Sequence, residues 1–153
     1  MPDINMRGLH VLLTPKCWQH FYRCLMLQLI YMSEATGGPD EVRTICEQAS
    51  SKNTRNEITG VIFLHNGHYF QALEGSKEHV EDTLLRIIVD PRHKNLHLLS
   101  RTRQGARQFG PWAMVECVTE ADKKFAAKLV ERRLSETSRE TAQLFLKNFS
   151  RLL

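Results

Sequence analysis

Two polar side chains, Tyr31 and Gln71, lie in the middle of apolar runs that are typical of buried strands. A buried phenol and a buried amide each need a hydrogen-bond partner, because an unsatisfied buried polar group costs about 1–3 kcal/mol. The glutamine amide carries a donor at one end and an acceptor at the other, so it can link a tyrosine hydroxyl to a third polar group. A purely structural Tyr–Gln hydrogen bond inside the core is the alternative interpretation.

The surrounding sequence predicts strands and helices in mixed order. Apolar residues with period two indicate strands, and apolar residues at i, i+3, i+4 and i+7 indicate helices. Asn66-Gly67 predicts a hairpin turn, and Asp40 and Ser76 are expected to cap two helices. The predicted elements are a strand at 26–33, a helix from 40 that ends within 53–57, strands at 58–64 and 68–73, a helix after 76 that ends at 90, strands at 96–102 and 113–118, and helices at 121–134 and 139–152.

This order predicts an α+β fold, a ferredoxin-like βαββαβ sheet with an extra strand and two C-terminal helices. In such a sheet the first and third strands lie side by side in the centre, which would bring Tyr31 and Gln71 together. We expect an N-terminal extension at 1–25, a domain at 26–118 and a helical pair at 119–153. Because the sequence pattern changes at Met26, this residue is also a candidate for the true start of translation.

The composition is that of a folded domain: of 153 residues, 42% are hydrophobic and 25% are charged. The net charge of +4 comes without a basic stripe interleaved with aromatic residues, so we expect no nucleic-acid partner. No apolar run reaches the roughly 18 residues of a membrane span, and we expect no membrane association. The four cysteines form no C-x-x-C pair, which favours reduced thiols, a cytoplasmic location and no metal site.

Five short motifs resemble those of the BLUF domain, the sensors of blue light using FAD. The resemblance extends over residues 29–114, and the motifs occur in the right order at compatible spacings. The two helices after Val118 resemble those of short, stand-alone members of the family without an enzymatic output domain. The motifs are LIYMS at 29–33, Asn53 followed by ITGV at 58–61, NGHYFQALEG at 66–75, DPRH at 90–93 and RQFGPWAM at 107–114.

The resemblance implies a blue-light photoreceptor that binds FAD non-covalently, with FMN not excluded. It implies that Tyr31 donates an electron and a proton to the excited flavin and that the Gln71 hydrogen bonds then rearrange. The further residues that it places at the flavin are Ile45, Asn53, Arg55, Ile87, Arg92 and His93. Four of them retain an alternative: ordinary core for the two isoleucines, a helix end for Asn53, and a surface position for His93. Lys52 departs from the family, which more often has a neutral polar residue there.

Three residues are implied in signalling: Ser33, Trp112 and Met114. Trp112 and Met114 are expected on one face of the last strand, one inward and one outward, with Ser33 placed to bond Trp112. Alternatively, Ser33 simply closes its strand. The signal would pass to a downstream effector protein or through a homo-oligomer, because we expect no enzymatic activity in the chain.

Two other functions stay open. A small flavin redox enzyme would need an acid or base beside the flavin, and His93 is the only candidate. A light-blind interaction domain would have no need of Tyr31, Asn53 and Gln71 together. An acylphosphatase of ferredoxin-like fold is a more remote alternative, since the sequence lacks a convincing phosphate-binding loop.

Overall fold

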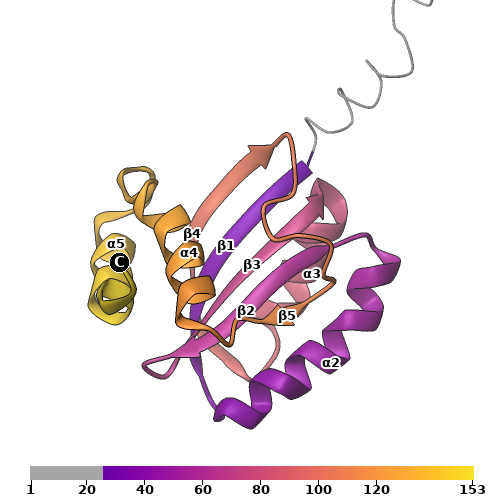
Figure 1. Ribbon diagram of the computed structural model, residues 1–153, viewed down its shortest axis with the longest axis horizontal. Coiled ribbons are helices and arrows are strands. Elements are labelled where there is room, and N and C mark those ends of the chain that lie inside the picture. Colours follow the sequence, from indigo (N-terminus) through magenta and orange to yellow (C-terminus); the bar gives the residue numbers. More distant parts are fainter. Residues whose placement is uncertain (1–25) are drawn as a thin grey trace, which may run out of the picture.

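The computed structural model describes residues 26–153, so the predicted extension at 1–25 lies outside the described residues. Strands and helices follow one another along the described chain in the predicted order (Figure 1). The elements are β1 (Met26–Ala35), α2 (Pro39–Arg55), β2 (Thr59–His65), β3 (His68–Ser76), α3 (Lys77–Ile88), β4 (His93–Gln104), β5 (Val115–Glu116), α4 (Glu120–Glu131) and α5 (Arg139–Phe149), with 3₁₀ turns at Leu134–Glu136 and Ser150–Leu152.

The five strands form one sheet in the order β4-β1-β3-β2-β5, which confirms the ferredoxin-like α+β fold. β1 lies between β3 and β4 and pairs antiparallel with both, so the first and third strands are neighbours as predicted. The extra strand β5 adds to the free side of β2 in parallel orientation. The register places Tyr31 directly opposite Gln71.

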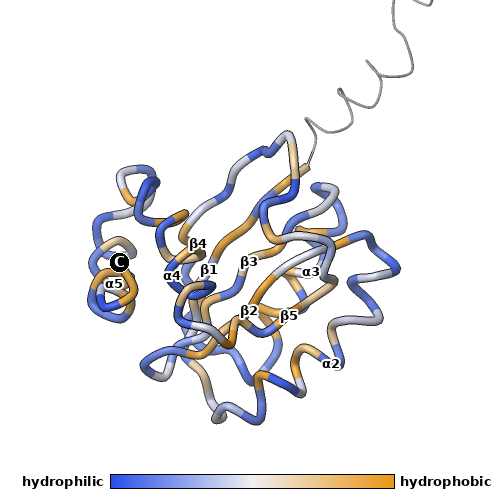
Figure 2. The backbone as a smooth tube through the Cα atoms, in the orientation of Figure 1, coloured by the Kyte–Doolittle hydropathy of each residue, from blue (hydrophilic) through white to orange (hydrophobic). Residues whose placement is uncertain are grey.

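The sheet separates two hydrophobic cores, because successive residues of a strand point to opposite faces. Leu29, Tyr31 and Leu73 face the first core, where α2 and α3 pack. Ile30, Met32 and Phe70 face the second core, which α4 and α5 cover. Figure 1 shows the C-terminal helices on the side away from α2, and Figure 2 shows the apolar residues concentrated in the central strands. No helix of the described residues is long and apolar enough to span a membrane.

The predicted turn and one of the two predicted caps are confirmed. Asn66 and Gly67 have φ values of 49° and 72°, the positive values that a type I′ turn needs. Ser76 accepts a hydrogen bond from the backbone N–H of His79 at 3.3 Å, at the start of α3. The prediction for Asp40 is wrong, since Gly38 occupies the N-cap of α2 and Pro39 opens the helix. Asp40 lies in the first turn, where its negative charge interacts favourably with the positive end of the helix dipole.

The last strand is much shorter than the predicted 113–118. β5 contains only Val115 and Glu116, and residues 105–114 form a loop between β4 and β5. The loop is held by contacts to distant segments: the Gly60 N–H donates to the carbonyl of Trp112 at 3.0 Å, and Asn53 Nδ2 donates to that of Ala113 at 2.7 Å. Trp112 and Met114 therefore precede the strand and do not share one of its faces, which corrects the prediction.

Candidate functional site

Tyr31 and Gln71 form a buried hydrogen-bonded pair at the centre of the sheet. The two side chains are 0% and 2% exposed, and the Tyr31 hydroxyl donates to Gln71 Oε1. Burial raises the pKa of Tyr31 well above its ordinary value, and the nearby charge of Asp90 acts in the same direction. The phenol therefore keeps its proton at neutral pH and is available as a donor.

The other end of the Gln71 amide has only a weak partner. Its Nε2 lies 3.7 Å from the sulfur of Met114, its one hydrogen-bond acceptor among residues 26–153. A thioether sulfur is a poor acceptor, so the amide retains capacity to donate to a stronger acceptor nearby. Met114 is 8% exposed and Trp112 is 55% exposed, which answers the question that the sequence leaves open: methionine is inward and tryptophan outward.

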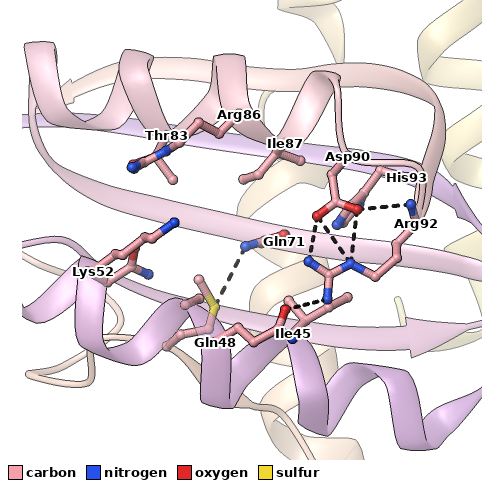
Figure 3. Close-up of a pocket in the computed structure, with 13 residues that line it drawn as sticks. Ile45, Gln48, Lys52, Gln71, Thr83, Arg86, Ile87, Asp90, Arg92 and His93 are labelled. Atoms are coloured by element: carbon pink, nitrogen blue, oxygen red, sulfur yellow. Dashed lines mark hydrogen bonds and ion pairs between the residues drawn. The ribbon is translucent and has the colours of Figure 1, made fainter.

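A pocket opens between α2 and α3 above this pair. Ile45 of α2 and Ile87 of α3 lie on opposite sides of it, and Gln71 lies between them on the sheet (Figure 3). The empty space measures about 650 Å³, including solvent at the mouth. Both isoleucines line the pocket, and both also pack in the core on this face of the sheet, so their contact with a flavin stays a prediction.

Charged residues gather at the two ends of the pocket. Lys52 and Arg86 lie at one end, where Arg86 donates to the Thr83 hydroxyl at 2.8 Å (Figure 3). At the other end Arg92 forms an ion pair of 2.5 Å with Asp90 and donates to Gln48 at 2.8 Å. This hydrogen bonding lowers the pKa of the Asp90 carboxyl, so the pair is fully charged at neutral pH.

Asn53 also borders the pocket, but Arg55 does not. Asn53 is buried and donates through Nδ2 to Ala113, while its side-chain oxygen accepts no hydrogen bond from residues 26–153. Arg55 is exposed in the last turn of α2 and is not among the residues that line the pocket. Lys52, three residues before it on the helix, lines the pocket instead.

Sequence reasoning missed Thr83 and Arg86 in this pocket. Thr83 precedes Ile87 by four residues and Arg86 by three, so Thr83 is a neighbour of both on the side of α3 that lines the pocket. The helical spacing around Ile87 was the available signal. It is a weak one, because it does not tell which side of the helix faces a pocket and which faces solvent.

His93 is buried beside Tyr31 and Tyr69 and contacts Ser33. The Ser33 hydroxyl and His93 Nδ1 are 2.8 Å apart, and the His93 ring lies 4.9 Å from the Tyr69 ring. Burial lowers the pKa of His93, which keeps the imidazole neutral at pH 7. The expected Ser33–Trp112 bond is wrong, because Trp112 lines a second hollow with Phe109 and Phe125 near α4.

The residues of the pocket fit the flavin ring that the resemblance implies. Two isoleucines from facing helices suit the apolar faces of a flat ring. The Gln71 amide N–H and the Asn53 side-chain oxygen can form hydrogen bonds with its polar edges. The lysine and arginines at the ends suit anionic groups. For a metal ion, residues 26–153 contain no group of three or more ligating side chains.

Known proteins are similar to this chain over the same region. A blue light- and temperature-regulated antirepressor of Escherichia coli is 36% identical over 93 residues, which are 59% of this chain and 23% of that protein. The structure of Klebsiella pneumoniae BlrP1 with FMN and cyclic diGMP is 30% identical, with a TM-score of 0.58 over 70% of this chain and 30% of that chain. The photo-activated state of BlsA is 26% identical, with a TM-score of 0.58 over 80% and 92% of the two chains.

The chain thus spans less than a third of the first two proteins and most of the third. The pattern that defines the BLUF family, sensors of blue light using FAD, matches residues 26–115. This match contains all five strands except the last residue of β5, and all the residues of the pocket. The chain belongs to the BLUF family of blue-light sensors.

Proposed function

We propose that this chain is a photoreceptor in which Tyr31 and Gln71 convert the absorption of blue light into a change of hydrogen bonding. The observation that carries the proposal is the row of contacts from the fully buried Tyr31, which does not itself line the pocket, to Gln71 and Met114, which do. A flavin bound in this pocket supplies an electron acceptor that blue light activates. Tyr31 is the electron and proton donor, and it regains both at the end of the cycle.

Gln71 is the part of the site that stores the change. We assign the arrangement seen in the structure to the dark state: the Gln71 oxygen accepts from Tyr31, and Nε2 faces the Met114 sulfur and the pocket. Rotation or tautomerisation of the amide exchanges its donor and acceptor ends. The contact with Met114 then changes as well, and this biases the 105–114 loop between two arrangements.

We further infer that the cofactor is FAD, held by polar and charged residues that line the pocket. Asn53 offers its side-chain oxygen, while Lys52 and Arg86 place two positive charges where an anionic group can lie. These charges suit the single phosphate of FMN as well, and the related BlrP1 structure contains FMN. Competition between the two flavins for the purified chain distinguishes them.

The output of the chain is proposed to be a protein contact, through a downstream effector or a second copy of the chain. The site supports a sensory role because Gln71 joins Tyr31 to Met114 of the 105–114 loop, a set of contacts that a change of hydrogen bonding can alter. His93, the candidate acid or base, lines the pocket and contacts Ser33, and its ring is tilted against that of Tyr69. A cytoplasmic location stays a prediction from the cysteine pattern.

The absorption spectrum of the FAD-loaded chain, in darkness and under blue light, tests this proposal. We expect a reversible shift of the flavin bands to longer wavelength without bleaching. Gln71→Leu should retain the flavin and lose the shift, because leucine fills a similar space without a donor or acceptor. A flavin that bleaches would favour a redox enzyme, and a chain that binds no flavin would favour a light-blind interaction domain.

A further inference from the structure

A buried carboxylate fixes the start of the loop that carries Met114. Glu74 of β3 is fully buried on the face of the sheet opposite the flavin pocket. Its carboxylate accepts hydrogen bonds from the backbone N–H of Gln108, at 2.9 and 3.0 Å, and of Phe109, at 3.2 Å. Bonds to an ionised acceptor are among the stronger ones in proteins. The loop is therefore held at residues 108–109 on this face, and at Ala113 and Met114 on the pocket face.

Gln28 of β1 connects this carboxylate to the C-terminal part of the chain. It lies opposite Glu74 in the register and is fully buried. Its Nε2 donates to Glu74 at 2.8 Å and to the Gln108 side chain at 3.0 Å, while its oxygen accepts from Gln104 at 3.2 Å. The same oxygen accepts from Arg133 at 3.3 Å. An anion on one side and a cation on the other thus fix which end of the amide points to each.

Arg133 brings the end of α4 into the same network. It is the second residue after α4 and is half-buried against the sheet. Besides Gln28, its Nη1 atom contacts the hydroxyls of Ser100 at 3.3 Å and Thr102 at 2.8 Å, both on β4. The network therefore runs across three adjacent strands, from the 105–114 loop to the end of α4, without passing through the flavin pocket.

We propose that Glu74, Gln28 and Arg133 are positioning residues that couple the 105–114 loop to α4. The inference rests on the proposed function, since it concerns where a displacement of Met114 is transmitted. A change at Gln71 alters one end of a loop whose other end is bonded to Glu74. Gln28 passes the resulting displacement to Arg133, and the conformation at the end of α4 changes. The light signal thereby reaches the C-terminal helices across the sheet.

Light-induced hydrogen exchange of the α4 amides in the FAD-loaded 153-residue chain tests this coupling. In the wild type we expect exchange in Glu120–Glu131 to differ between darkness and blue light. Arg133→Met should keep the light-induced shift of the flavin spectrum and lose the exchange difference in α4. The matched control is Arg132→Met at the neighbouring exposed position, which should keep both signals. Gln28→Met, measured in parallel, removes the centre of the network and should behave like Arg133→Met.

The outcomes separate the coupling from the photochemistry. An undiminished α4 exchange difference in a folded Arg133→Met or Gln28→Met variant would overturn the coupling. A wild type with a spectral shift but no α4 difference would overturn it as well, while leaving the photoreceptor proposal intact. A wild-type spectrum that light does not change would overturn the photoreceptor proposal and, with it, this inference. Circular dichroism and flavin content in the dark establish that each variant is folded.

Discussion

Within the site, single residues are distinguished by their partners more than by their type. Tyr31 and Tyr69 are both fully buried on the pocket side of the sheet. Tyr31 donates to Gln71, whereas Tyr69 donates to Glu41 at 3.0 Å. Only Tyr31 is therefore connected to an amide that can exchange its donor and acceptor ends. His93 is distinguished in the same way by its contact with Ser33.

The lowered pKa of His93 predicts a dependence of stability on pH. Burial is the main cause, so the native state takes up this proton less readily than the unfolded chain, whose histidine has a pKa of about 6.5. The free energy of unfolding should be constant above that value and fall as the pH decreases below it, by at most about 1.4 kcal/mol per pH unit for one group. Urea titrations between pH 5 and pH 8, a range chosen around that value, measure this slope.

The variant His93→Gln should show a smaller slope over the acidic range, since glutamine keeps a polar contact with Ser33 but does not titrate. Some slope should remain, because burial lowers the pKa of His65 as well. An identical slope in wild type and variant would contradict the assignment to His93.

The hairpin turn and one of the two caps are predicted well, because they depend on the residue types at neighbouring positions. Elements that depend on contacts between segments far apart in the sequence are predicted poorly. The Asn66-Gly67 turn and the Ser76 cap follow from residue types alone, whereas the pairing of the strands that carry Tyr31 and Gln71 follows from the order of the elements. The short β5 could not be predicted, because Asn53 and Gly60 hold the preceding loop from 50 to 60 residues away. The inward position of Met114 depends on the same contacts, and no periodicity in the sequence reports them.

Gly67 of the hairpin turn and Gly105 of the 105–114 loop are expected to respond differently to substitution by alanine. Gly67 has φ of +72°, so Gly67→Ala forces a side chain into the left-handed region and should lower the free energy of unfolding by about 1–2 kcal/mol. Gly105 has no positive φ and no atom within 4 Å of an added Cβ. Gly105→Ala should therefore be neutral or stabilise by up to about 1 kcal/mol. Thermal or urea unfolding measures both, and equal effects would contradict this account of the turn.

In the whole molecule, the sheet separates the flavin pocket from the C-terminal helices (Figure 1). Phe149 of α5 is fully buried on the helix side, with ring centres 5.8 Å from Phe70 and 6.1 Å from Phe63. Phe70 immediately precedes Gln71 in β3. The helices thus pack against the very strand that carries the proposed switch, but on its other face.

Truncation of Phe149 should destabilise the fold strongly. Phe149→Ala removes the centre of this aromatic cluster and should cost about 3–5 kcal/mol of unfolding free energy. The control is Phe125→Ala in α4, whose side chain is 53% exposed and should cost far less. Urea unfolding in the dark measures both variants. A small effect of Phe149→Ala would mean that α5 contributes little to the core that it covers here.

The light-minus-dark absorption spectrum of Tyr31→Phe, beside that of Tyr69→Phe, tests the central claim most directly. Both variants remove one hydroxyl from a buried tyrosine of the same core and leave the ring in place. Because only Tyr31 contacts Gln71, Tyr31→Phe should bind FAD and lose the reversible long-wavelength shift, while Tyr69→Phe should keep it. A normal shift in Tyr31→Phe would contradict the claim that Tyr31 and Gln71 together form the light-driven switch.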